Sequence, residues 1–223
     1  MSSTIPTIPT DSYAMQRALW PESGQHILAC YDEKTIVVYQ AYSPAIGNAA
    51  AASGRFGAGW SRTRMSWIKP NFFWMMYRCG WATKVDQERV LAVRIARTGF
   101  DTILGLAVES SYLPDVHGPD RDAWATSGKS ADVRMQWDPD HAPDGSKQER
   151  RAIQLGLRGD TLRRFASEWT EEIVDITPFV QAQRENVSRD RLAHLVTPEE
   201  RVYVPVDESL CTRLRLSTLP QSA

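Results

Sequence analysis

Large aromatic rings and positive charges interleave over residues 61–81, a segment that contains no acidic residue. Its cations are Arg62, Arg64, Lys69 and Arg78. Aromatic rings offer flat contact area, and Arg and Lys bind phosphate oxygens. The segment is therefore typical of a site for a phosphate-bearing ligand with flat bases, such as a dinucleotide or a nucleic acid. The other interpretation is a core helix whose cations extend from its rim into solvent, and the sequence leaves both open.

Alternation of residue types over residues 62–68 predicts a strand that carries Arg62 and Arg64 on one face. Residues two apart on a strand are about 7 Å apart, which suits the two phosphates of a pyrophosphate. A turn beginning at Lys69 then leads into a short helix, predicted over residues 72–79 and ended by Gly80.

Polar residues also stand inside or at the ends of predicted strands. Residues 35–41 (TIVVYQA) predict a buried strand, and Gln40 stands near its end. Gln136 and Asp138 flank a tryptophan at the end of another strand, and Gln154 lies inside the apolar strand AIQLGL. A buried glutamine needs hydrogen-bond partners. Gln154 is therefore either a structural bridge to the backbone or a residue that faces a pocket.

Motifs for the common hydrolases, zinc proteases and phosphate-binding loops are missing from the sequence. The run DPDH at residues 138–141 has metal-ligand types close together, but such an acidic turn is more often a solvated loop, and we expect no metal site. The cysteines Cys30, Cys79 and Cys211 are too far apart for a disulfide framework or a zinc site. A reducing cytoplasm is the expected location.

Composition indicates an ordinary globular chain, with 223 residues, 42% hydrophobic residues, 24% charged residues and a net charge of −1. This balance argues against coating nucleic acid by bulk charge but allows a local basic groove. No apolar run approaches the roughly 18 residues of a membrane span, so we expect no membrane partner. We expect a disordered tail at residues 1–22, one domain at residues 23–207 and a second tail at residues 208–223.

The predicted elements do not alternate regularly between strand and helix, which favours an α+β fold. Residues 26–31 and 35–41 predict a hairpin, and Ser43 and Pro44 begin a helix that ends at Gly54. Segments 112–128 and 139–149 are expected to be a loop and a flexible insertion. The other expected strands are 89–96, 132–137, 152–157, 172–176 and 202–206, and the other helices 100–109, 161–169 and 177–195.

Five segments together resemble an uncharacterised family, known as domain of unknown function number 4291, over about residues 31–206. They are VVYQAYSPAI, SRTRMSWIKPNFFWMMYRCGW, ERVLAVRI, RMQWDPD and AIQLGL. This resemblance implies no activity by itself.

The run YQAYSPAIGNAAAASGRF is similar to the opening of ADP-ribosyltransferase domains, in which an apolar strand ends in Tyr-His and leads into a helix and then a glycine. That resemblance implies a mixed or antiparallel split β-sheet core flanked by helices, with NAD as substrate. Gln40 stands where the family has histidine, and Gln154 where a glutamate is expected. Both depart from the pattern, so the catalytic carboxylate is sought in Asp138 or Glu149, and Tyr77 is a candidate ring against nicotinamide.

The resemblance thus implies an NAD-dependent ADP-ribosyltransferase that releases nicotinamide and modifies a nucleic acid or a small molecule. A non-enzymatic module that binds RNA or single-stranded DNA through residues 61–81 is the alternative, and an interaction protein with a purely structural aromatic segment is the third. The expected catalytic residues are Gln154, Asp138 and Tyr77, and the expected NAD-binding residues are Tyr39, Gln40, Ser43, Arg62, Arg64, Trp67 and Lys69.

Overall fold

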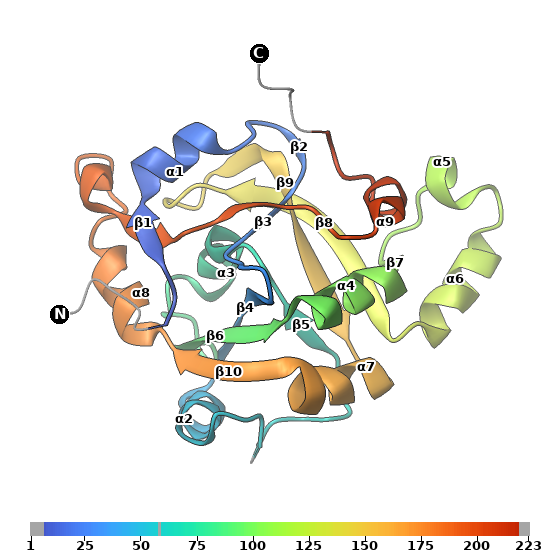
Figure 1. The fold of residues 1–223 in the computed structure, drawn as a ribbon, viewed down its shortest axis with the longest axis horizontal. Coiled ribbons are helices and arrows are strands. Elements are labelled where there is room, and N and C mark those ends of the chain that lie inside the picture. Colours follow the sequence, from blue (N-terminus) through green and yellow to red (C-terminus); the bar gives the residue numbers. More distant parts are fainter. Residues whose placement is uncertain (1–6, 58, 219–223) are drawn as a thin grey trace.

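A three-stranded antiparallel sheet lies at the core of the fold (Figure 1). Strand β4 (Thr35–Tyr42) pairs along its whole length with β6 (Arg89–Ala96), and β6 pairs with β10 (Thr170–Asp175). The computed structural model describes residues 7–57 and 59–218. Apolar residues, many of them β-branched, fill both faces of β4 and β6, as is typical of strands covered on both sides.

A second sheet is built around the long strand β9, which pairs with three others. Strands β5 and β8 run antiparallel to β9, whereas β2 runs parallel to it, and β7 runs parallel to β8. Two short antiparallel pairs, β1 with β11 and β3 with β12, complete the strands. Their bounds are β1 (Thr10–Ser12), β2 (Gly24–Gln25), β3 (Ile27–Ala29), β5 (Ser66–Ile68), β7 (Ala107–Glu109), β8 (Val133–His141), β9 (Lys147–Leu157), β11 (Val196–Pro198) and β12 (Arg201–Tyr203).

Helices surround the sheets (Figure 1). They are α1 (Tyr13–Leu19), α2 (Pro44–Ser53), α3 (Phe72–Cys79), α4 (Arg97–Leu106), α5 (Pro114–His117), α6 (Arg121–Ser130), α7 (Gly159–Arg164), α8 (Thr177–Arg184) and α9 (Glu208–Arg213), with a π-helical turn η1 (Phe165–Trp169) and a 3₁₀ turn η2 (Leu192–His194).

Successive side chains of β4 enter two different apolar cores. Ile36 and Val38 pack with residues of β8, β9, α4 and α7, whereas Val37 and Tyr39 pack with residues of α1, α3 and α8. Because successive side chains point to opposite faces of a strand, the β4–β6–β10 sheet lies between the sheet around β9 and a layer of helices. The architecture is a single compact α+β domain with mixed strand directions, as predicted in coarse terms.

One pair of backbone hydrogen bonds links the two sheets near the site described below. The N–H of Tyr39 donates to the carbonyl of Lys69 at 2.7 Å, and the N–H of Lys69 donates back to Tyr39 at 3.2 Å. Lys69 directly follows β5, so this bridge fixes β5 and the start of α3 against β4.

Helices α2 and α3 begin and end where the sequence predicts. Ser43 and Pro44 stand at the start of α2, and Gly54 ends it with a left-handed φ of 65°. The Asn71 side chain accepts a hydrogen bond of 2.7 Å from the N–H of Trp74 at the start of α3, and Gly80 ends that helix at φ 60°. A side-chain cap marks the start of α3, whereas Ser43 makes no capping hydrogen bond and α2 begins at a proline in its first turn; a left-handed glycine ends both helices.

The predicted terminal tails are wrong for the residues that the structure describes. Residues 7–22 include β1 and α1, and Tyr13 and Trp20 are buried. The Trp20 indole donates to the carbonyl of Glu200 at 2.8 Å, so this segment packs on a distant part of the chain. Helix α9 likewise follows residue 207 and buries Leu210. Residues 1–6 and 219–223 of the predicted tails lie outside the described residues.

Several expected elements differ in length. The predicted loop at residues 112–128 contains α5 and most of α6, and the helix expected over residues 177–195 ends at Arg184. The flexible insertion predicted at 139–149 is instead the end of a β8–β9 hairpin. This hairpin is held by a buried ion pair between Arg150 and Asp140, with 2.6 Å between nitrogen and oxygen.

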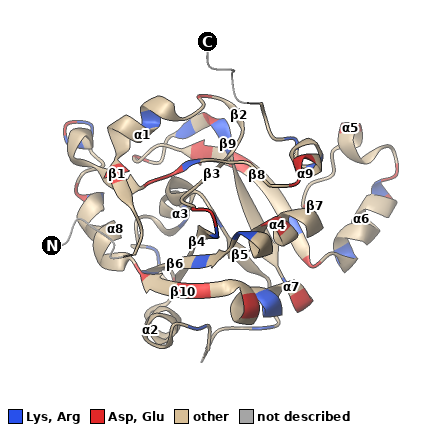
Figure 2. Cartoon of the chain, viewed as in Figure 1, with Lys and Arg blue, Asp and Glu red and all other residues tan. Residues whose placement is uncertain are grey.

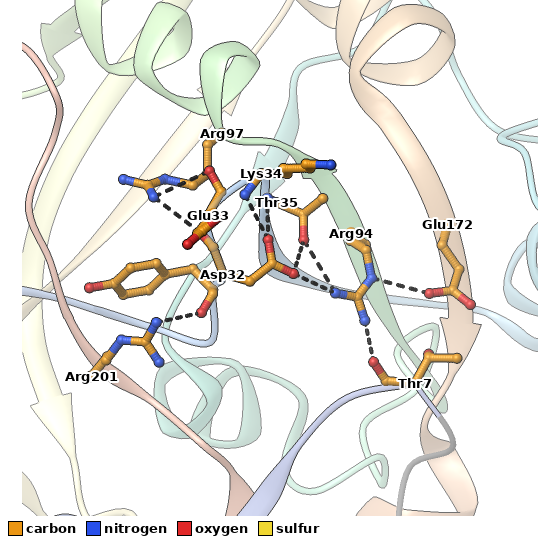
Figure 3. A network of polar contacts seen from close by, with 10 residues as sticks. Thr7, Asp32, Glu33, Lys34, Thr35, Arg94, Arg97, Glu172 and Arg201 are labelled. Carbon is orange, nitrogen blue, oxygen red and sulfur yellow. Dashed lines mark hydrogen bonds and ion pairs between the residues drawn. The ribbon is translucent and has the colours of Figure 1, made fainter.

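The chain turns sharply at Asp32, between β3 and β4, but the predicted hairpin is wrong as a strand pair, because the pairing of the two segments is reduced to an isolated bridge between Tyr31 and Ile36. The Asp32 carboxylate accepts hydrogen bonds from the backbone N–H groups of Lys34 at 2.8 Å and Thr35 at 2.7 Å (Figure 3). Arg94 lies 3.7 Å from Asp32 and 3.2 Å from Glu172, which ties the turn to β6 and β10. The two strands pair with different partners, so the turn joins two sheets.

Positive and negative residues are interspersed over the elements visible in Figure 2, in keeping with the net charge of −1. Within residues 7–57 and 59–218, no helix has both the length and the apolar character needed to cross a membrane.

Candidate functional site

A cleft of about 750 Å³ lies between the end of β4, strand β5, the start of α2 and the middle of β8 and β9. Its volume is within the range of small-molecule sites. Of the ten residues that the sequence assigns to a site, those that line the cleft are Gln40, Ser43, Arg64, Trp67, Lys69 and Gln154.

The other four predicted residues do not line the cleft. Tyr39 is fully buried in the core, because its side chain points to the opposite face of β4 from Gln40. Arg62 is exposed in the loop before β5. Tyr77 stacks on His141 with 3.6 Å between ring centroids, away from the cleft. Asp138 stands behind two glutamines, as described below. None of these four residues lines the cleft, so the structure gives no direct support for their predicted contact with a ligand there.

Lys69 is a buried cation at the cleft. Its side chain is 4% exposed, and its Nζ lies 6.0 Å from the centre of the Trp74 ring. No carboxylate of the described residues lies within ion-pair distance of it. Burial, and then the charge of Arg78, lower the pKa of Lys69 to about 8, although Asp138 offsets part of this effect. A buried ammonium without a counter-ion favours binding of an anion.

Two glutamines hold a carboxylate directly behind the cleft wall. Gln136 and Gln154 face each other across β8 and β9 and both line the cleft. The amide of Gln154 donates to Asp138 Oδ2 at 2.7 Å, and that of Gln136 donates to Oδ1 at 3.0 Å. Burial raises the pKa of Asp138, while these two hydrogen bonds and the charge of Lys69 lower it in part. Gln154 thus lines the pocket, and its partner is the Asp138 side chain rather than the backbone group that the structural interpretation expects.

Gln40 positions strand β5 within the cleft wall. Its amide donates to Ser66 Oγ at 2.8 Å and to the carbonyl of Trp67 at 3.1 Å. The Tyr42 hydroxyl lies 3.2 Å from the same Ser66 hydroxyl and accepts a bond of 2.9 Å from the Trp60 indole. Gln40 therefore acts through the geometry of β5 as well as by lining the cleft.

Arginines stand at the cleft where the sequence expects cations, but in a different arrangement. Arg64 and Arg78 line the cleft, together with the carboxylate of Asp86. The predicted fork of Arg62 and Arg64 on a strand is wrong, because β5 begins only at Ser66 and both arginines lie in the preceding loop. That loop folds back through the Ser61 hydroxyl, which accepts a 3.0 Å bond from the N–H of Arg64.

Most aromatic rings of residues 61–81 belong to the core. Phe72, Phe73, Trp74 and Trp81 are buried, with the first two and Trp81 in mutual edge-on contact. Only Trp67 among the tryptophans of this segment lines the cleft. The core interpretation therefore holds for the apolar half of the segment, while its cleft-lining cations stay candidates for a ligand site.

Tyr42, Trp60 and Gln136 also belong to the cleft but were not assigned to it from the sequence. Tyr42 lies two residues after Gln40 on one strand, and Gln136 two residues before Asp138 on another. The period of two on these strands is the signal that places each pair on one face.

The DPDH run does not form a metal centre. The Asp140 carboxylate is occupied by Arg150, and the His141 ring stacks on the Tyr77 ring beside Trp74. No three His, Cys, Asp or Glu side chains of the described chain are grouped so as to hold a metal ion.

Comparison with known families identifies one match. The sequence profile described as domain of unknown function DUF4291 matches residues 26–203, from the start of β3 to the end of β12. No curated protein matches the chain. Because the match spans well over half of the 223 residues, the chain belongs to the DUF4291 family.

Proposed function

We propose that the cleft binds NAD and that the protein transfers ADP-ribose from NAD to a nucleic-acid or small-molecule acceptor. The observation that carries this proposal is the pairing of a buried, counter-ion-free lysine with a hydrogen-bonded carboxylate at one cleft. Lys69 favours an anion, and Asp138, held by Gln154 and Gln136, provides negative charge beside it. The resemblance of residues 39–56 to the opening of ADP-ribosyltransferase domains supports the same interpretation.

The pyrophosphate of NAD is the part of the ligand that the cations suit. Arg64 and Arg78 lie at the same cleft as Lys69, and Asp86 is the one carboxylate among the cleft-lining residues. A bound phosphate would restore charge balance around Lys69, and charge-assisted bonds to phosphate are about twice as strong as neutral ones. Trp67 offers a ring to a base at the same wall.

The reaction requires negative charge near the ribose. When the bond between ribose C1′ and nicotinamide breaks, nicotinamide leaves with the bonding electrons and the ribose becomes oxocarbenium-like. An acceptor oxygen or nitrogen then forms the new bond to C1′ and loses one proton. The amide N–H of Gln154 donates to Asp138, which leaves its carbonyl oxygen to accept from a ribose hydroxyl. Asp138 thereby stabilises the positive charge at one remove, through Gln154, while the proton lost by the acceptor passes to water in the cleft.

Binding of RNA or single-stranded DNA without turnover is the alternative function. Stacking platforms for single strands need exposed rings. Phe72, Phe73, Trp74 and Trp81 are buried, which leaves Trp67 as the cleft's contribution from this segment. We therefore favour the transferase.

The test separates binding from chemistry. Asp138→Asn keeps the shape of the side chain and removes its charge. We expect release of nicotinamide to fall about 100-fold, because the negative charge behind Gln154 is lost, while NAD still raises the melting temperature. Asp190→Asn, a matched change at an exposed position, is the control. If Asp138→Asn releases nicotinamide at the wild-type rate, the proposed role of this carboxylate is wrong.

A further inference from the structure

A second, smaller pocket adjoins the cleft. It has a volume of about 330 Å³ and lies between α6 and the sheet, with Trp124, Lys129, Arg134 and Arg158 among its lining residues. Met65 lines both this pocket and the cleft, so the two hollows adjoin at this residue. A long ligand seated in the cleft therefore has the second pocket as its neighbour across Met65.

The second pocket is positively charged. Its lining residues include three cations and no carboxylate. Arg134 forms no ion pair within the described chain; its guanidinium lies 5.8 Å from the centre of the Trp124 ring, and its one hydrogen bond is a long one, 3.5 Å, to the carbonyl of Ser110. Burial and the neighbouring charge of Arg158 lower the pKa of Arg134. Neither guanidinium has a carboxylate partner within the described chain.

Arg158 and Arg134 hold different positions in this pocket. The Nε of Arg158 donates to the carbonyl of Ala131 at 2.8 Å, and its Nη2 to that of Gly128 at 3.3 Å, so it caps the end of α6. Arg134 lies against Gly128 so closely that a Cβ atom there would overlap its Nη1. The glycine therefore leaves room for the Arg134 guanidinium at the pocket, and most of the donors of that guanidinium remain free.

We propose that this pocket binds a phosphate group of the acceptor and that the acceptor is a single-stranded nucleic acid reaching from the cleft past Met65. The role of this strand as acceptor rests on the proposed transferase function, but binding of its phosphate does not require NAD. Guanidinium forks match phosphate oxygens in geometry and charge. A single strand carries a phosphate at every nucleotide, so one chain can place its reacting group in the cleft and a neighbouring phosphate beside Arg134.

The test measures binding in the absence of NAD. A fluorescein-labelled single-stranded RNA 12-mer is titrated with the full-length protein, and anisotropy is read at several salt concentrations. The variants are Arg134→Gln and Lys129→Gln, and Arg189→Gln is the matched control on an exposed arginine outside the pocket. We expect Arg134→Gln to weaken binding about 10-fold and to reduce the salt slope by about 0.7, the contribution of one phosphate contact to a single strand. Arg189→Gln should bind as wild type does.

Gly128→Ala gives a second, independent variant. Alanine is the better helix former, so α6 keeps its stability, but the new methyl group displaces the Arg134 guanidinium while its charge remains. We expect this variant to bind the RNA as weakly as Arg134→Gln does and to melt no lower than wild type. Melting curves thus distinguish loss of the phosphate site from loss of the fold.

The outcomes separate the possible sources of the phosphate. RNA binding that depends on Arg134 supports the proposal even if no nicotinamide is ever released, in which case only the transferase fails. If inorganic phosphate binds in an Arg134-dependent way but RNA does not, the nucleic-acid acceptor is overturned. If Arg134→Gln, Lys129→Gln and Gly128→Ala all bind as the Arg189→Gln control does, or if wild type binds neither probe, the phosphate site itself is overturned.

Discussion

Replacing Lys69 with methionine should stabilise the protein and abolish binding of the anion. Lys69 is buried, and its pKa falls from 10.5 to about 8 in the folded state. The difference is about 2.5 pH units, and one unit corresponds to about 1.4 kcal/mol, so holding the charged lysine in the fold costs up to about 3 kcal/mol. Methionine has a similar length and no charge. We therefore expect Lys69→Met to raise the free energy of unfolding by about 1–3 kcal/mol at pH 7.

The pH dependence of this gain has a definite sign. Between pH 8 and pH 10.5 the unfolded lysine keeps a proton that the folded lysine has lost, so the contribution of Lys69 to stability rises with pH. The advantage of Lys69→Met is therefore full below pH 8 and shrinks as the pH rises toward 10.5. The Cys30 thiol, whose pKa burial raises to about 12, titrates in the opposite sense, but it is present in both proteins and cancels in their difference.

Urea unfolding followed by tryptophan fluorescence at pH 7, 8, 9 and 10 measures this difference directly. Lys34→Met makes the same chemical change at an exposed lysine and should leave stability nearly unchanged at every pH. A Lys69→Met variant that is less stable than wild type at pH 7 refutes the reasoning, as does a stability difference that stays constant from pH 7 to pH 10. Either result would mean that Lys69 has a counter-ion or full hydration in the folded protein.

Three further substitutions test other parts of the account. Arg64→Gln should weaken NAD binding about 10-fold, because Arg64 lines the cleft. Arg62→Gln, two residues earlier and outside the cleft, should not weaken it, and isothermal titration calorimetry of both variants tests the difference. Gly99→Ala should cost about 2 kcal/mol in urea unfolding, because its methyl group would overlap the Trp169 ring; unchanged stability would show that the ring moves freely. Burial raises the pKa of Glu200 well above its usual range, so wild-type stability relative to Glu200→Gln should fall as the pH rises above about 4.5; a flat difference from pH 4.5 to pH 7 would contradict this.

Elements with local signals could be predicted from the sequence with accurate bounds. Helix α3 has a capping asparagine before it and a glycine after it, and β6 is a mostly apolar run rich in valine and isoleucine. Both match the predicted residues 72–79 and 89–96. The β8–β9 hairpin also has a local signal, the turn sequence Pro143, Asp144 and Gly145. A turn at these residues pairs the two strands and places Gln136 opposite Gln154.

Other features depend on contacts between distant segments. The order of residues 7–22 comes from packing of Tyr13 and Trp20 against partners that include the backbone of Glu200, so a Pro- and Ser-rich composition could not reveal it. The burial of Lys69 likewise follows from the bridge between β5 and β4 rather than from its neighbours in sequence. The sequence predicts a cation at Lys69, but it does not predict that Lys69 is buried without a carboxylate partner among the described residues. That combination is what makes Lys69 a candidate anion-binding residue.

The measurement that tests the central claim most directly is a thermal-shift titration with NAD, with release of nicotinamide measured in the same samples. We predict that NAD raises the melting temperature of wild type, that this rise is absent in Lys69→Met, and that nicotinamide appears when a single-stranded RNA acceptor is supplied. Lys34→Met should respond as wild type does. If NAD at millimolar concentration neither shifts the melt nor releases nicotinamide with acceptor present, the cleft is not an NAD site and the transferase proposal is wrong.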